Sequence, residues 1–204
     1  MVAIAGGRNW PDSWPDHDIF LSPEALGTAR VRARDQTAAY GHDTGYFHLG
    51  RRESSHEIGT IGEVAALAFL RKLSGTSGVS YELNNMGSKH DISIIFDGKV
   101  EGLHVKTGRY RAWPNQDQPF GVHFSQRLEM TAGGLILVSL LMDTQNLARI
   151  EGILLPAELS KCKVLEEGDL FPGRTYSSRT RNRLTFLRDY KPVTSELIGN
   201  IICR

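Results

Sequence analysis

A carboxylate, an imidazole and an ammonium group lie within one short stretch of this sequence, at Asp91, His104 and Lys106. A carboxylate can hold a divalent cation, and an imidazole can bind a transition metal or accept a proton. An ammonium group beside them can stabilise negative charge that develops during a reaction. These residue types could form a catalytic cation site if the fold brings them together.

The segment that joins these residues predicts how they would meet. Asp97-Gly98 separates two segments of alternating apolar and polar residues and is typical of a two-residue hairpin turn. Such a turn places Asp91 opposite His104, and Lys106 lies two residues further along the same strand. Because opposed residues share a face of a sheet, we expect all three polar groups on one face.

The same register makes the other face of the hairpin a core face. Gly102 would lie on the polar face, where its missing side chain leaves room for a ligand. We expect His90 to point to the opposite face, as a surface or loop residue. The apolar residues expected in the core are Ile92, Ile94, Phe96, Leu103 and Val105.

Two helices are predicted before the hairpin. The first starts at Ser22-Pro23, which is typical of a helix N-terminus, and continues to about Tyr40 with three arginines off its apolar stripe, at positions 30, 32 and 34. The second is expected over 60–73, after a loop at 41–57. It is apolar nearly all round, which favours burial on most sides, and Glu63 lies near its start.

Strand signals follow the hairpin at 135–141 and 148–155, and Pro156 begins a short helical turn. Together these elements predict an α/β protein with a central mixed β-sheet flanked by helices. We expect one domain over residues 1–204, with an N-terminal arm at 1–22 and a basic segment at 161–204.

The order of these residues resembles the PD-(D/E)xK nuclease superfamily. The resemblance is carried by Glu63 in an apolar helix, Asp91 at a strand and the tetrad Leu103-His104-Val105-Lys106; it covers 59–107 closely and the later strands loosely. It implies a restriction-endonuclease-like fold and a DNA endonuclease of restriction, phage or repair type that depends on Mg²⁺ or Mn²⁺. By position, Asp91 would bind the metal, the Val105 carbonyl and Glu63 would add to its shell, and Lys106 would orient or activate water.

The sequence departs from the family pattern at His104, where the family has Asp or Glu. Imidazole binds transition metals well but suits Mg²⁺ poorly. Three interpretations stay open. His104 could ligate Mn²⁺ or a similar ion, it could act as the general base while Glu63 supplies the missing carboxylate, or the site could have decayed and bind DNA without cutting it.

Basic residues predict where DNA would lie. Arg109 and Arg111 come shortly after Lys106 in the chain, with Tyr110 and Trp113 available to stack on a base or sugar. From residue 161 to the end, nine Lys or Arg face five Asp or Glu. The backbone contacts expected from this segment are Arg179, Arg181 and Arg183.

Overall composition limits the remaining classes. The net charge is +1, the longest apolar run is far too short to span a membrane, and two cysteines provide neither a disulfide framework nor zinc-ligand spacing. We expect a cytoplasmic protein of prokaryotic or phage origin that binds DNA, not membranes, and could form a homodimer. The rival functions are a decayed nuclease-fold protein that binds DNA or a partner protein, and a non-nucleolytic enzyme on an unrelated α/β fold.

Overall fold

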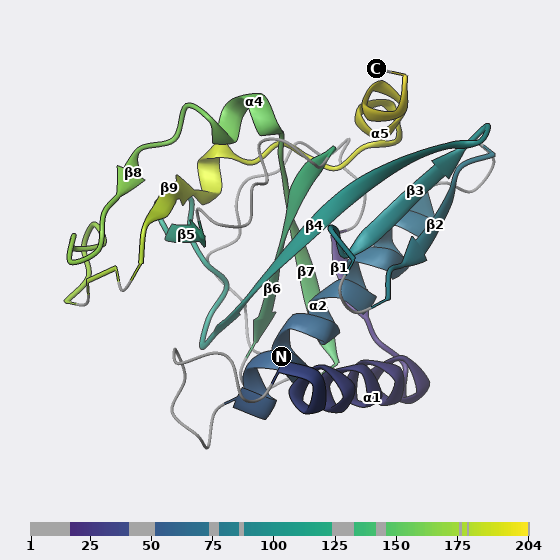
Figure 1. Ribbon diagram of the computed structural model, residues 1–204, viewed down its shortest axis with the longest axis horizontal. Coiled ribbons are helices and arrows are strands. Elements are labelled where there is room, and N and C mark those ends of the chain that lie inside the picture. The colour runs from purple at the N-terminus through teal and green to yellow at the C-terminus, as the bar shows by residue number, and fades with distance from the viewer. Residues whose placement is uncertain are drawn as a thin grey trace, which may run out of the picture.

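The computed structural model describes residues 17–40, 52–73, 78–85, 88–123, 133–141, 146–175, 177–178 and 180–203. It is a mixed α/β structure in which helices flank a large curled mixed sheet (Figure 1). The six strands of this sheet lie in the order β1-β7-β6-β4-β3-β2, and a second sheet has the order β5-β9-β8. The strands are β1 (Asp18–Phe20), β2 (Ser80–Leu83), β3 (Ile92–Phe96), β4 (Lys99–Tyr110), β5 (Pro119–His123), β6 (Gly134–Leu141), β7 (Leu147–Leu154), β8 (Val164–Leu165) and β9 (Asn182–Phe186).

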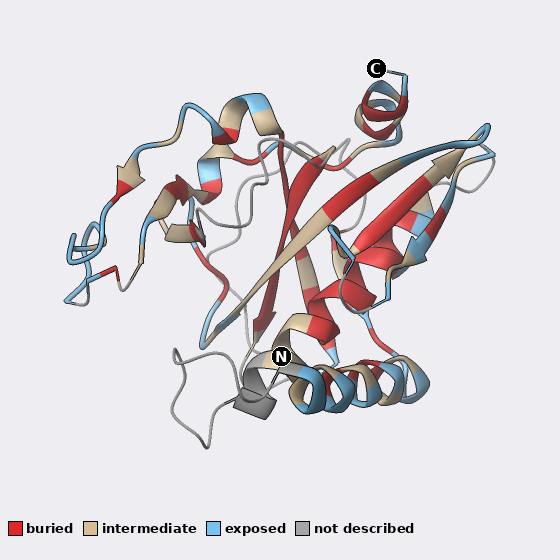
Figure 2. Ribbon diagram, viewed as in Figure 1, coloured by how far each residue is buried: buried red, intermediate tan, exposed pale blue. Residues whose placement is uncertain are grey.

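The strands predicted at 135–141 and 148–155 lie side by side in the interior of the large sheet, as β6 and β7. β6 runs parallel to β4 on one side and antiparallel to β7 on the other. Ile136 and Val138 of β6 pack in one core cluster, and Leu135 and Leu137 pack in a second cluster. Because successive side chains of a strand point to opposite faces, β6 is covered on both faces, which explains its unbroken apolar sequence. Figure 2 shows this buried centre.

The predicted hairpin is present. Asp97 and Gly98 both have positive φ, 47° and 74°, as a type I′ turn requires. The strand pairs run from Phe96 with Lys99 to Ile92 with Leu103, which confirms the predicted register for β3. The side chains of Ile92, Ile94 and Leu103 are fully buried on the face expected to be the core.

The helices cover the core face of this sheet. α1 (Pro23–Tyr40) has the predicted bounds, whereas α2 (Arg52–Leu73) begins within the segment that we expected to be a loop. The extra turns have no continuous apolar stripe, and they are held by α1 instead. Thr37 Oγ1 lies 2.8 Å from His56 Nδ1, and the buried Thr60 hydroxyl donates to the Ala29 carbonyl at 2.9 Å.

Both ends of the described chain are more regular than the sequence predicted. Within the predicted arm, β1 pairs with β7, and Asp18 accepts two hydrogen bonds from Arg149 at 2.7 and 3.1 Å. The predicted turn α4 (Pro156–Leu159) lies just before the basic segment. The basic segment itself contains β8, β9, the short 3₁₀ helix η3 (Leu187–Asp189) and the apolar helix α5 (Ser195–Ile202). We did not predict α5. No helix in the described ranges is long and apolar enough to cross a membrane.

Candidate active site

Asp91 lies just before the first residue of β3, at the point beyond which this edge of β4 has no strand partner. β4 is paired with β3 as far as Leu103, while its later residues pair with β6 on the other side. The Asp91 amide donates to the Leu103 carbonyl at 3.0 Å, and Asp91 Oδ2 accepts a hydrogen bond from the Val105 amide at 2.7 Å. Asp91 is therefore bonded to the strand edge through both its backbone and its carboxylate.

This position differs slightly from the expected one. Asp91 does not form a ladder pair with His104, because its amide bonds to Leu103 and its side chain folds onto the edge of β4. The two side chains still meet: His104 Nδ1 lies 3.6 Å from Asp91 Oδ2, which is an ionic contact when the imidazole is protonated and is too long for a good hydrogen bond. Asp91 is 33% exposed and His104 is 12% exposed at the side chain.

The space expected above Gly102 is filled by His90. A Cβ atom built on Gly102 would lie 2.2 Å from the His90 ring, and the rings of His90 and His104 are 6.4 Å apart in an edge-to-face arrangement. The expectation that His90 points to the opposite face, and that Gly102 leaves room for a ligand, is wrong. His90 and His104 share one face, and among the described residues neither His90 Nδ1 nor His104 Nε2, both buried, has a hydrogen-bond partner.

Lys106 is electrostatically coupled to Asp91. Burial lowers the pKa of the Lys106 ammonium, and the nearby Asp91 carboxylate partly opposes this, with a net lowering. A lowered pKa makes the ammonium a better proton donor than an exposed lysine. The structure thus brings together three of the predicted site residues: Asp91, His104 and Lys106.

Helix α2 approaches β4 closely and brings Glu63 within electrostatic range of Asp91. A Cβ atom on Gly62 would lie 1.8 Å from Thr107 Oγ1, so only glycine allows this contact between helix and strand. Glu63, the next residue, is 11% exposed at its side chain. Burial, and then the negative charge of Asp91, raise the pKa of Glu63 to about 7, although Arg32 and Gln36 partly oppose the shift.

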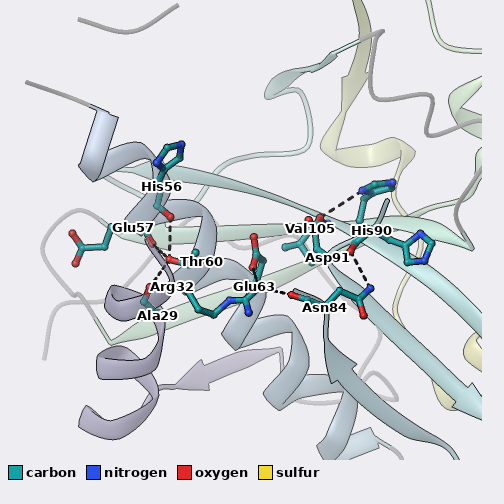
Figure 3. A network of polar contacts seen from close by, with 11 residues as sticks. Ala29, Arg32, His56, Glu57, Thr60, Glu63, Asn84, His90, Asp91 and Val105 are labelled. Atoms are coloured by element: carbon teal, nitrogen blue, oxygen red, sulfur yellow. Dashed lines mark hydrogen bonds and ion pairs between the residues drawn. The ribbon is translucent and has the colours of Figure 1, made fainter. Parts of the chain in front are cut away.

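Two further residues of the site were not predicted (Figure 3). Arg32 Nη2 of α1 donates to Glu63 Oε2 at 3.3 Å and to the Asn84 carbonyl at 2.8 Å. The Asn84 side chain donates to the His90 carbonyl at 3.0 Å and accepts from Ser93 Oγ at 2.7 Å, so it fixes the chain just before Asp91. The only sequence signal for Arg32 was its place off the apolar stripe of α1, which indicated exposure.

Asp91 is the point at which the two faces of the sheet meet. Val105 packs with the core cluster that contains α2, so Glu63 approaches from the Val105 face. His104 and Lys106 alternate with Val105 and share the opposite face, alongside Leu135 and Leu137 of β6. Because the Asp91 carboxylate bonds to the strand edge between these faces, it influences the pKa values of both Glu63 and Lys106.

A cation bound at Asp91 would have few protein ligands and would keep much of its water. In the described residues, no group of three or more His, Cys, Asp or Glu side chains is placed to hold a metal ion. Mg²⁺ in proteins is commonly bound through only one or two carboxylates. Asp91 Oδ1 has no hydrogen-bond partner among the described residues, and Glu63 is a second carboxylate within electrostatic reach. The Val105 carbonyl leaves the strand on the same side as its amide, toward Asp91.

The predicted DNA contacts differ in their surroundings. Arg109 and Arg111 are exposed at the end of β4 and just after it. Arg181 forms an ion pair with Glu166 at 3.1 Å, and Arg183 donates to the Ser160 and Cys162 carbonyls at 2.9 and 3.2 Å. Arg179 lies outside the described residues. The expectation that Trp113 stacks on nucleic acid does not fit its burial beneath Arg149, whose guanidinium carbon lies 4.1 Å from its ring centre.

Comparisons with family models, curated proteins and solved structures found no match to this chain.

Proposed function

We propose that this protein is a divalent-metal-dependent DNA endonuclease with a restriction-endonuclease-like fold. The observation that carries the proposal is the position of Asp91. Its carboxylate bonds to the Val105 amide at the open edge of β4 and is coupled electrostatically to Glu63 and to Lys106. These are the residue types, and the order along the chain, on which the resemblance to the PD-(D/E)xK superfamily rests.

The charges of the site favour a phosphodiester substrate. With both carboxylates ionised, Asp91 and Glu63 balance Lys106 and Arg32, so the protein groups alone sum to about zero. A divalent cation bound by the carboxylates would leave an excess of two positive charges. A site of this kind attracts an anion and stabilises the additional negative charge of a phosphoryl transition state.

In this mechanism, Asp91 and Glu63 would hold the cation, and the Val105 carbonyl would add a further oxygen ligand. The bound cation would supply Lewis-acid stabilisation of the phosphate oxygens. Lys106 positions the attacking water and stabilises negative charge, and the buried Nε2 atom of His104 takes the proton from that water. The water oxygen bonds to phosphorus, one P–O ester bond breaks, and the leaving oxygen takes a proton, which gives a phosphomonoester and a hydroxyl group.

The test is cleavage of supercoiled plasmid and branched DNA by the purified chain in Mg²⁺, in Mn²⁺ and in EDTA. We expect metal-dependent nicking that is lost in Asp91→Asn and Lys106→Met. Glu82→Gln, at an exposed carboxylate on β2, is the matched control and keeps wild-type activity. Cleavage that survives both site substitutions would refute the assignment.

Binding without cleavage would support the second function. A protein that binds DNA in EDTA with a steep salt dependence, and gives no product in either metal, is a decayed nuclease-fold protein. The imidazole at position 104, where the family has an acid, is the feature that favours this alternative.

A further inference from the structure

Arg32 is placed differently from the neighbouring arginine on the same helix. Arg30 is 45% exposed at its side chain and pairs with Glu57 at the surface, at 3.1 Å. Arg32 is only 21% exposed and turns inward to Glu63. Helix α1 therefore directs one arginine into the candidate active site.

The protein satisfies this guanidinium only in part. Both described hydrogen bonds come from the same nitrogen, Nη2, which donates to Glu63 and to the Asn84 carbonyl. The Nε atom is buried and has no acceptor among the described residues. An unmet buried donor destabilises the folded protein, and the cost is greater for a charged group. An acceptor brought by a ligand would satisfy this donor.

The chemistry of the site identifies that acceptor as an oxygen of a phosphate group. Guanidinium presents donors in a planar fork that matches phosphate oxygens, and it remains charged at all working pH values. A divalent cation bound by Glu63 and Asp91 would compete with Arg32 for the Glu63 carboxylate. Arg32 would then keep its bond to the Asn84 carbonyl while its remaining donors turn to the anion.

We propose that Arg32 is a phosphate-binding residue of this site. It binds the backbone phosphate at the scissile bond, and it stays hydrogen-bonded to Glu63 until the cation binds. The proposal rests on the proposed function, because it assigns a contact to the same substrate. It adds a residue from α1, outside the segment that carries the resemblance, and predicts a measurable effect on the salt dependence of DNA binding.

The first test measures binding of fluorescent duplex DNA to the full chain in Ca²⁺, a hard cation that oxygen ligands accept. Anisotropy titrations over a range of salt concentrations give the slope of log K against log salt. We expect Arg32→Met to reduce the magnitude of this slope by about 1, since one phosphate contact is lost. Arg32→Lys keeps the charge and the slope. Arg30→Met removes a surface charge from the same helix and leaves the slope unchanged.

The second test measures cleavage in Mn²⁺ alongside thermal unfolding. We expect Arg32→Met to lower kcat by about 10²–10³-fold, and Arg32→Lys to lower it by about tenfold or more with little change in KM. If Arg32→Met fails to fold, Arg32→Lys decides, since its ammonium can still bond to Glu63 and Asn84.

The outcomes separate the two proposals. Wild-type kcat in Arg32→Lys, or a wild-type salt slope in folded Arg32→Met, would mean that Arg32 only supports the fold and would overturn this inference alone. A wild-type protein that neither binds nor cleaves DNA in any of these metals would overturn the proposed function and this inference with it.

Discussion

The carboxylate of Asp91 accepts a 2.7 Å hydrogen bond from the Val105 amide. This amide lies beyond Leu103, the last residue of β4 that pairs with β3, so the carboxylate takes the place of a strand carbonyl as its acceptor. A backbone donor of the sheet edge is thereby satisfied by a site residue. The Asp91 side chain consequently has two roles, one in the fold and one in the site. Substitutions that differ in hydrogen bonding but not in charge can separate them.

Asp91→Asn and Asp91→Ala provide this separation. Asparagine keeps an oxygen that can accept from the Val105 amide. We therefore expect the free energy of unfolding of Asp91→Asn to stay within about 1 kcal/mol of the wild-type value, while cleavage is lost. Alanine leaves the Val105 amide without that partner, and we expect an additional loss of about 1–2 kcal/mol. Urea denaturation of the three proteins measures the difference. Equal stability of the two variants would show that the bond has no structural role.

His104→Glu tests the departure from the family pattern. A carboxylate at this position supplies an oxygen ligand, which Mg²⁺ prefers to an imidazole nitrogen. We expect the ratio of cleavage rates in Mg²⁺ and Mn²⁺ to rise at least tenfold in His104→Glu relative to wild type. His104→Gln is the control, because it removes the imidazole without adding charge, and its ratio should not rise. An unchanged ratio in His104→Glu would show that a carboxylate introduced at position 104 does not reach the cation.

Local signals predicted the elements that carry this site. The Asp97-Gly98 turn and the alternation on either side of it depend on nearest neighbours, and they predicted the β3–β4 register correctly. Strand β6 was recognised because burial on both faces requires an apolar run, and β7 was recognised as a mostly apolar segment that Pro156 ends. The early start of α2 was missed, because those turns are stabilised by contacts with α1 such as Thr37 with His56.

The site residues that were missed share the same cause. Arg32, Asn84 and His90 enter the site through packing between elements that are distant in sequence, and their own spacing gives no sign of it. His90 was predicted on the wrong face, since the strict alternation of a strand does not extend past Asp91, where the ladder stops. Gly102 is explained by the ring that covers it and not by a vacant space for a ligand.

Gly62 and Gly59 give a matched comparison on one helix. A Cβ atom at Gly62 would collide with the Thr107 side chain, whereas Gly59 has nothing within 4 Å. We expect Gly62→Ala to destabilise the fold by about 1–3 kcal/mol through overpacking and to reduce cleavage, because α2 must move away with Glu63. Gly59→Ala should stabilise by about 0.5–1 kcal/mol, since alanine favours the helix. Equal stability of both variants would contradict the close contact between α2 and β4.

Arg111 and Arg183 should separate DNA binding from folding. Arg111 is exposed, whereas Arg183 donates to two backbone carbonyls near the end of α4. We expect Arg111→Ala to weaken DNA binding and reduce its salt dependence without a change in stability. We expect Arg183→Ala to lower the free energy of unfolding by about 1 kcal/mol, because it removes both hydrogen bonds. DNA titrations and urea denaturation of both variants measure these effects, and a reversed pattern would assign the DNA contact to Arg183.

Glu63 predicts how stability depends on pH when no divalent cation is present. Its pKa is about 7 in the folded protein against 4.5 as the ordinary value, so between these pH values the folded state binds more protons than the unfolded state. The free energy of unfolding therefore falls as pH rises from about 4.5 to about 7, by up to about 3 kcal/mol. Glu63→Gln resembles the protonated side chain, so we expect it to lose this pH dependence and to be more stable than wild type at pH 8 in EDTA. Glu82→Gln on the exposed face of β2 should follow the wild-type curve. Parallel pH curves for wild type and Glu63→Gln, measured by urea denaturation, would show that Glu63 is not electrostatically coupled to the site.

Added Mn²⁺ should stabilise wild type more than Glu63→Gln, because only the wild-type protein offers both carboxylates to the cation.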